Sequence, residues 1–357
     1  MAHTVRRSAL IPTLDERSVD AILITRLPNV RYLTGFTGSN AQLIVTAGTS
    51  VFFTDGRYTE QSRHEVSDAE LVTYLGVFGE PLAEACERLG IERLGFEAHD
   101  VTVDGLEKLK AASPDVEFVP VGDPVGRLRW VKDPEELEML REAQACSDRA
   151  FEDILDILAV GMTERQVSLH LEQALRRGGA DALSFESIVA FGEQAAEPHH
   201  QPSHRVLEEG DVIKLDFGGL FGGYHADMTR TIAFGSPPPE LRKIHDIVRE
   251  AQQAGIDAVR PGVTGGEVDA AARKVIEDAG YGPRFSHGLG HGVGLEIHEG
   301  PNFARAGEDV IPVGAVMTVE PGIYVPGLGG VRIEDMVEVV EGGCRVIGTS
   351  IRELVEL

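Results

Sequence analysis

An internal repeat in the last two-thirds of the chain limits its possible folds more than any other feature. Leu140-Arg141 matches Leu241-Arg242, and Gly161-Met162-Thr163 matches Gly262-Val263-Thr264, at one ungapped offset of 101 residues (241 − 140 = 262 − 161 = 101). A register held this far indicates an internal duplication, although two unrelated helix-turn-helix units could converge on the same capping residues. Further identities at this offset are Ala150/Ala251, Asp156/Asp257, Val167/Val268 and Gly179/Gly280.

Each copy of the repeat predicts a helix, a Gly-x-Thr turn and a second helix. Thr163 with Gln166, and Thr264 with Glu267, have the spacing of a capping box, in which the threonine caps the helix that follows. Strand-like runs follow both copies. We therefore expect two pseudo-symmetric halves, each built of helices and a sheet, with a site between them.

The first part of the chain has a different pattern, and 357 residues are enough for two domains. Short apolar or β-branched runs at 21–24, 42–45 and 51–54 are typical of strands, with a helical pattern around 81–89. Asp133 and Pro134 mark a later helix start as N-cap and first helical residue. We predict an α/β (α+β) protein with an N-terminal domain at 1–122 and a second domain at 123–357.

Net charge and cysteine content exclude several kinds of partner. The chain has 33 Lys and Arg against 58 Asp and Glu, a formal net charge of −25 that repels nucleic-acid phosphates. The N-terminal segment has no apolar stretch long enough for a signal peptide or a membrane span. Cys86, Cys146 and Cys344 lie far apart, as reduced structural thiols do. We expect a cytoplasmic protein that binds neither nucleic acid nor membrane.

Two aspartates in the second domain are candidate metal ligands. Asp216 ends the apolar run 212–216, and Asp227 follows eleven residues later, across a glycine-rich turn. An antiparallel hairpin would place the two carboxylates side by side, where they repel each other. A shared proton would relieve that repulsion, and a metal ion would relieve it more completely.

Three further segments carry imidazole and acidic side chains. His287 and His291 have i, i+4 spacing, but glycines at every second position from 288 to 294 argue against a helix there. Glu320 precedes Pro321-Gly322, and alternation places Arg332 and Glu334 on one face of a strand. Each of these residues taken alone could be a salt-bridged, exposed or structural side chain, but all of them together form a pattern that is hard to explain that way.

Four carboxylates and one imidazole form a hard, oxygen-rich ligand set. Such a set suits Mn²⁺ or a comparable divalent ion better than a thiolate-bound structural zinc. Two ions that share bridging carboxylates could activate a water molecule near neutral pH and polarise a carbonyl group. The sequence thus predicts a dinuclear centre, with Co²⁺ or Zn²⁺ as alternatives to Mn²⁺, on Asp216, Asp227, His291, Glu320 and Glu334.

These segments resemble the pita-bread metallopeptidases, and specifically the Xaa-Pro peptidases, meaning aminopeptidase P and proline dipeptidase (prolidase). The resemblance covers essentially the whole chain, because residues 29–39 and 54–58 are similar to the creatinase-like N-terminal domain of that group. It implies a pita-bread catalytic domain, a homodimer, and peptide substrates with proline second. The motifs are Pro198-His199-His200, 216–218 through 223–231, 290–299, Glu320-Pro321-Gly322 and Arg332-Ile333-Glu334-Asp335.

The resemblance also implies a role for each site residue. Asp216 would bind one metal, His291 with Glu320 the other, and Asp227 and Glu334 would bridge them. His199 and His298 would contact the scissile carbonyl or the substrate backbone and stabilise the tetrahedral intermediate. His287 would line the pocket, and Arg332 would orient Asp227 or Glu334. No role follows for His200, His204 and His225, which we interpret as surface or pocket-wall residues.

Related activities on the same fold remain as alternatives. The separate N-terminal domain argues against a methionine aminopeptidase, and five retained ligands argue against a metal-free creatinase or an inactive binding protein. A dipeptidase must recognise the free carboxylate of proline with a cation, for which Arg57 and Arg31 are candidates. Aminopeptidase P is the reading we favour, with prolidase as the alternative.

Overall fold

The protein is described by a computed structural model that covers residues 2–357 and forms two compact units, one ending at Arg129 and one spanning Trp130–Leu357. The predicted boundary at 122/123 lies just before the short helix α7 (Pro124–Arg129). The Asp123 carboxylate accepts from the Gly126 amide, and Arg129 donates to Asn29 of the first unit at 2.7 Å. These bonds explain why α7 groups with the first unit.

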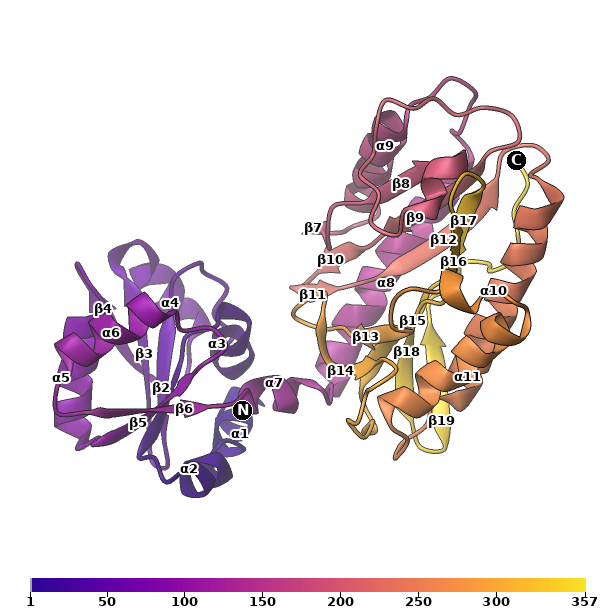
Figure 1. Ribbon diagram of the computed structural model, residues 1–357. Helices are drawn as coiled ribbons and strands as arrows, with labels where there is room; N and C mark the ends of the chain where they lie inside the picture. Colours follow the sequence, from indigo (N-terminus) through magenta and orange to yellow (C-terminus); the bar gives the residue numbers. More distant parts are fainter. Residues whose placement is uncertain (1) are drawn as a thin grey trace. The chain divides into compact units, whose positions relative to one another are not determined.

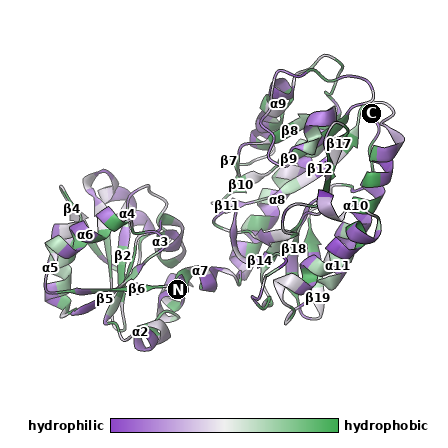
Figure 2. Cartoon of the chain, viewed as in Figure 1, coloured by the Kyte–Doolittle hydropathy of each residue, from purple (hydrophilic) through white to green (hydrophobic). Residues whose placement is uncertain are grey.

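The first unit is an α/β layer structure around a six-stranded mixed sheet of order β4-β3-β2-β1-β5-β6. The strand runs predicted at 21–24, 42–45 and 51–54 are confirmed as β1, β2 and β3. Figure 2 shows hydrophobic residues on β2 and hydrophilic residues on the surrounding helices. The strands are β1 (Ala21–Ile24), β2 (Gln42–Thr46), β3 (Ser50–Asp55), β4 (Glu70–Tyr74), β5 (Arg93–Glu97) and β6 (Glu117–Val121). The other helices are α1 (Ala2–Ser8), α2 (Ile11–Arg17), α3 (Leu27–Thr34), α4 (Thr59–Glu65), α5 (Gly79–Leu89) and α6 (Val103–Ala112).

The second unit begins with one half of the repeat. Asp133 caps α8 (Pro134–Leu155), as predicted, and it also forms a capping box with Glu136; α9 (Glu164–Arg177) follows. Both helices cover an antiparallel sheet of order β12-β9-β8, and apolar residues from helices and sheet form one core. The strands of this half are β7 (Ala182–Leu183), β8 (Ile188–Phe191), β9 (Val212–Phe217), β10 (Gly219–Phe221), β11 (Tyr224–His225) and β12 (Met228–Ala233), with the 3₁₀ helix η2 (Gly192–Ala196) after β8.

The other half repeats the plan with a separate core. Helices α10 (Pro239–Ala258) and α11 (Gly265–Asp278) precede a five-stranded antiparallel sheet of order β14-β13-β15-β18-β19. The hairpin β16–β17 lies against β9 and β12 of the first half (Figure 1). The strands are β13 (Gly290–Gly292), β14 (Glu299–Phe303), β15 (Val316–Val319), β16 (Gly322–Val325), β17 (Gly329–Arg332), β18 (Asp335–Val340) and β19 (Gly343–Ile347).

The two copies of the repeat adopt the same local structure. Thr163 and Thr264 both have φ −86° and ψ 156°, and both form the predicted capping box. Gly161 and Gly262 both have φ 87°, a value that glycine adopts without steric cost. The Gly161 amide donates to the Leu207 carbonyl, and the Gly262 amide donates to the Ile311 carbonyl, both at 3.0 Å. The segment that contacts each turn is therefore also equivalent in the two copies.

Within residues 2–357, none of the helices combines the length and the apolar character needed to cross a lipid bilayer.

Candidate metal centre

Asp216 lies on β9, and Asp227 lies just before β12, the strand paired with β9, as the hairpin prediction required. Asp216 is opposite Thr229 in the antiparallel register, and Asp227 directly precedes the first residue of β12. The alternation along β9 places Ile213, Leu215 and Phe217 in the core under the helices. Asp216 therefore points to the other face of the sheet, toward the second half of the unit.

The second half contributes the other three predicted ligands from the ends or middle of its strands. His291 is the central residue of β13, Glu320 follows β15, and Glu334 lies between β17 and β18. The strand predicted through Arg332 and Glu334 therefore ends at Arg332. His291 Nε2 lies 3.5 Å from both Asp227 Oδ2 and Glu320 Oε1. Asp227, His291 and Glu334 present ligand atoms that all lie within 4.8 Å of one another.

A single pocket of about 480 Å³ collects every site residue that the sequence predicted. Its walls come from both halves of the repeat, so the site lies between them. The predicted residues that line it are Asp216, Asp227, His291, Glu320, Glu334, His199, His287, His298 and Arg332.

The ligand set fits divalent cations, because the protein itself supplies too little positive charge to balance the buried carboxylates. Asp216 Oδ1 and Glu334 Oε1 are buried without a hydrogen-bond partner within the described residues. Burial, then repulsion from neighbouring carboxylates, raises the pKa of Asp227 and of Glu334 well above the ordinary range, and burial raises that of Glu320 to about 7. Burial lowers the pKa of His291 to about 4, which keeps the imidazole neutral, as ligation requires. Cations bound here would offset both the burial of these carboxylates and the repulsion between them.

Arg332 has a different partner from those we expected. Its guanidinium donates to the Asp216 carboxylate, whereas the resemblance suggested Asp227 or Glu334. It reaches Glu334 only indirectly, since its Nε donates to Thr229 Oγ1 at 3.0 Å and Thr229 donates to Glu334 Oε2 at 2.7 Å. The packing of β17 against β9 decides this, and no local pattern could reveal it.

The histidines occupy distinct positions in the pocket. His287 Nε2 lies 2.9 Å from the Tyr324 hydroxyl and its Nδ1 lies 2.7 Å from the Gly288 carbonyl, so its ring is held at both nitrogens. His298 packs edge-on against His291, with ring centroids 4.3 Å apart. His199 lies on a turn after η2 and is exposed. Burial lowers the pKa of His287 to about 3 and also lowers that of His298, which favours the neutral imidazole in both.

The three histidines without a predicted role are each hydrogen-bonded. His200 lines the pocket wall and bonds to the carboxylates of Glu197 and Glu164. His204 lies 3.1 Å from an Arg165 nitrogen, and His225 lies 2.9 Å from Ser184 Oγ. His200 is buried, so the surface interpretation fails for it, whereas the pocket-wall interpretation holds.

Sequence reasoning missed several buried polar residues that support the site. Tyr324 bonds to both His287 and Arg332, and burial raises its pKa to about 12. Asp269 and Arg273 form an ion pair on α11 that holds the segment around His287. A lysine, Lys214, is fully buried in the middle of β9. Its charge inside an apolar strand was the one signal that the sequence offered for these residues.

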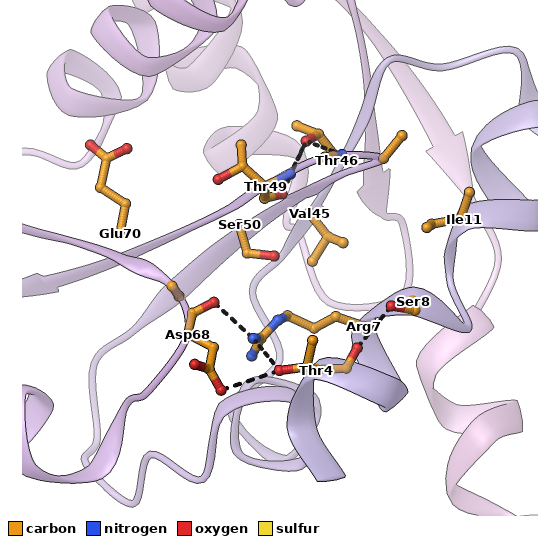
Figure 3. A pocket seen from close by; sticks show the side chains of 13 residues that line it. Thr4, Arg7, Ser8, Ile11, Val45, Thr46, Thr49, Ser50, Asp68 and Glu70 are labelled. Carbon is orange, nitrogen blue, oxygen red and sulfur yellow. Dashed lines mark hydrogen bonds between the residues drawn. The ribbon is translucent and has the colours of Figure 1, made fainter. Parts of the chain in front are cut away.

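The first unit has a pocket of its own, of about 430 Å³, which no sequence pattern predicted. Figure 3 shows Arg7 crossing its floor, where the guanidinium donates to the Asp68 carbonyl and to Thr4. Glu97, His99 and Asp123 of this unit also present ligand atoms close together. The Glu97 carboxylate, however, already accepts from two backbone amides and from Asn29, so it has a structural task.

Comparison with known proteins identifies both parts of the chain. Residues 138–341 match the model of metallopeptidase family M24, and residues 6–131 match the creatinase/prolidase N-terminal domain. An Xaa-Pro dipeptidase of Pyrococcus furiosus is 36% identical over 98% of this chain and 99% of its own. The structure of an Xaa-Pro dipeptidase from Bacillus anthracis is 41% identical, with a TM-score of 0.97 over 99% of this chain and all of its own. That of an X-Pro aminopeptidase from Thermotoga maritima is 37% identical, with a TM-score of 0.91 and the same coverage.

The family model spans more than half of the chain, and full-length relatives exceed 30% identity. The chain therefore belongs to metallopeptidase family M24, with a creatinase/prolidase-type N-terminal domain and a pita-bread catalytic domain.

Proposed function

We propose that this protein hydrolyses the peptide bond between an N-terminal residue and a following proline. The observation that carries the proposal is the convergence of all nine predicted site residues on one pocket of the family M24 domain. The names of full-length relatives support the choice of proline, since two are Xaa-Pro dipeptidases and one is an X-Pro aminopeptidase.

Five side chains would hold two divalent ions. Asp216 would bind the first, His291 and Glu320 would bind the second, and Asp227 and Glu334 would be shared by both. When bound, such ions, with Mn²⁺ as our first choice and Co²⁺ or Zn²⁺ as alternatives, would supply a nucleophilic water near neutral pH and polarise the scissile carbonyl. Arg332 would hold the Asp216 carboxylate in place through its direct contact.

The imidazoles would act on the substrate. His199 and His298 donate to the carbonyl oxygen or the substrate backbone, where negative charge develops as the tetrahedral intermediate forms. His287 lines the pocket in an orientation fixed by Tyr324 and the Gly288 carbonyl. Hydrogen bonds placed before the reaction need no reorganisation during it, which is the source of their catalytic effect.

The length of the substrate separates two candidate activities. Relatives named as dipeptidases favour prolidase, which needs a free cation for the proline carboxylate. Among the residues that line this pocket, the one lysine or arginine is Arg332, and its hydrogen bonds go to Asp216, Tyr324, Thr229 and the Pro198 carbonyl. Of the two candidates in the first unit, Arg57 is already paired bidentately with Asp55. We therefore retain aminopeptidase P as the main proposal and prolidase as the second.

Two properties of the whole protein complete the proposal. We expect a homodimer, by analogy with the family, and sedimentation velocity at micromolar concentration would test it. We also place the protein in the cytoplasm, which the three unpaired cysteines support.

The decisive experiment is an assay of metal-stripped protein with and without added Mn²⁺, Co²⁺ or Zn²⁺. Three substrates are compared: an Xaa-Pro dipeptide, an Xaa-Pro-Xaa tripeptide and an Xaa-Ala control. We expect metal-dependent release of the N-terminal residue from the proline substrates alone, and the tripeptide-to-dipeptide ratio assigns the subclass. Failure to cleave either proline substrate with any of the metals would overturn the proposal.

A further inference from the structure

Lys214 is a fully buried lysine that neither the metal chemistry nor the substrate contacts explain. It lies in the middle of β9, on the same face as Asp216, and has no exposed surface. A lysine nitrogen removed from water needs hydrogen-bond partners within the protein. Those partners indicate what the residue does.

The hydrogen bonds of Lys214 all go to one short segment of backbone. Its Nζ donates to the carbonyls of Ala195 at 3.1 Å, of Glu197, and of Pro198 at 3.4 Å. These three carbonyls belong to the four residues that directly precede His199. The Nζ atom also lies 5.3 Å from the centroid of the Tyr324 ring.

Beyond η2, the segment that Lys214 holds lies outside helices and strands, and its other side-chain anchors include Arg332 at Pro198 and Glu164 at His200. Residues 197–200 form neither helix nor strand after η2 ends at Ala196, and the His199 side chain is exposed at the pocket. The Pro198 carbonyl accepts a further bond from Arg332 at 3.3 Å. At Gly330 a Cβ atom would lie 2.2 Å from the Ala195 carbonyl oxygen, so β17 and η2 already approach as closely as two backbones can.

We propose that Lys214 is a positioning residue, which sets the place of the His199 imidazole by fixing the three carbonyls that precede it. The inference rests on the proposed function, because that function gives His199 its contact with the substrate. A turn fixed through its backbone presents the next side chain at a defined distance and angle, whatever side chains the turn itself carries. Small displacements of a catalytic group reduce rates strongly, so such a clamp has a kinetic signature.

A double-mutant cycle tests this coupling. Lys214→Met keeps the unbranched stem and removes every hydrogen-bond donor. We expect kcat to fall by about ten- to hundredfold, KM to change much less, and metal content to stay equal to wild type. In a His199→Ala background the same substitution should lower kcat by no more than about twofold, because the imidazole that it displaces is already absent.

Val212→Ala is the matched control, since Val212 lies on the same face of the same strand, is buried, and lines no part of the pocket. Its effect should be the same in both backgrounds. An equal loss of kcat from Lys214→Met with and without His199 would overturn the inference, as would a loss of bound metal, which would route the effect through Asp216. If Lys214→Met does not fold, Lys214→Gln takes its place in the cycle, with a smaller expected loss and the same dependence on His199.

Hydrogen exchange on the metal-free protein separates this inference from the proposed function. The amides of residues 193–200 should exchange faster in Lys214→Met than in wild type and should be unchanged in Val212→Ala. Unchanged exchange in that segment would overturn the clamp, even if the peptidase activity is confirmed. Faster exchange in an enzyme that cleaves no proline peptide would instead leave the clamp standing and overturn only the function assigned to His199.

Discussion

The two halves of the catalytic unit are built on the same frame but hold the site in different ways. Both have a long helix, a glycine with φ 87°, a threonine cap with the same dihedral angles, and a second helix. The first half contributes two aspartates and His199, and the second half contributes His291, Glu320 and Glu334. Neither half holds the whole ligand set, so the site exists only where the two meet.

The supports behind the histidines also differ. In the first half a single buried carboxylate, Glu164, accepts from the Phe191 and Ser203 amides and from His200, next to His199. In the second half an ion pair on α11 does this work: Asp269 accepts from the Leu289 amide, and Arg273 donates to two carbonyls on either side of residue 286. A duplicated frame thus fixes where the loops begin and end, while unrelated polar anchors determine where the histidine side chains of the pocket point.

The largest expected effect comes from the two residues proposed to bridge the metals, one from each half. Asp227→Asn and Glu334→Gln should each lower kcat/KM by about 10³-fold or more, because each removes a shared anionic ligand. Metal content by elemental analysis and hydrolysis of an Xaa-Pro-Xaa peptide measure the loss. Both variants should remain folded by circular dichroism, since the amides replace carboxylates whose pKa is raised by burial in the metal-free protein. Full activity in either variant would contradict the bridging role.

The two polar anchors, Glu164 in the first half and the Asp269–Arg273 ion pair in the second, should contribute differently to the free energy of unfolding. Arg273→Met leaves Asp269 buried without its partner and should lower the free energy of unfolding by about 3–5 kcal/mol. Glu164→Gln keeps the shape of the side chain and one acceptor oxygen, so its cost should be smaller, about 2 kcal/mol. Urea denaturation of the two variants side by side gives the comparison. Equal costs would mean that the two anchors are equivalent after all.

His199 and His298 provide a comparison of the two halves in catalysis. Replacing either by alanine should lower kcat by about 10²–10³-fold, the usual cost of one donor to a developing oxyanion. Steady-state kinetics with metal content as the control would measure both. A loss confined to KM would show instead that the imidazole binds substrate and transition state equally.

One pH-dependent contribution to stability should belong to the second half alone. His245 and Gln144 occupy equivalent places in the repeat (245 − 144 = 101), and both are buried. Burial lowers the pKa of His245 to about 4, so the folded state favours the neutral ring. Between pH 6.5 and 4 the unfolded chain binds the extra proton, and stability therefore falls as pH falls through that window.

For His245 the loss at pH 5 relative to pH 7.5 should be about 2 kcal/mol, and His245→Gln should remove it. Denaturant titrations of wild type and variant at both pH values measure the difference. An identical pH dependence in the two proteins would exclude His245 as its source.

The smallest effects should be equal in the two halves. Thr163→Ala and Thr264→Ala each remove one side-chain cap of the same geometry and should each cost about 1 kcal/mol. The two caps share no hydrogen-bond partner, so the double variant should lose about the sum. Thermal unfolding would measure these changes, and clearly unequal costs would break the equivalence of the two frames.

Local chemistry allowed much of this protein to be predicted from its sequence. The helix starts at Asp133, Thr163 and Thr264 depend on residues three positions apart, and the strands of the first unit depend on short apolar runs. The glycines around His291 correctly argued against a helix at that position, where the chain forms β13. The candidate ligands could be named because carboxylates at the ends of apolar strands are costly without a cation.

Tertiary structure alone decided how the site is supported. Arg332 lies against Asp216, 116 residues away in sequence, and Lys214 reaches a turn that precedes it by 16 to 19 residues. The pKa of Glu320 is raised to about 7 only because the packing of both halves removes its carboxylate from water. Caps and strands follow from neighbours in sequence, whereas burial, charge partners and the orientation of buried side chains depend on which distant surfaces meet, and no local pattern carries that information.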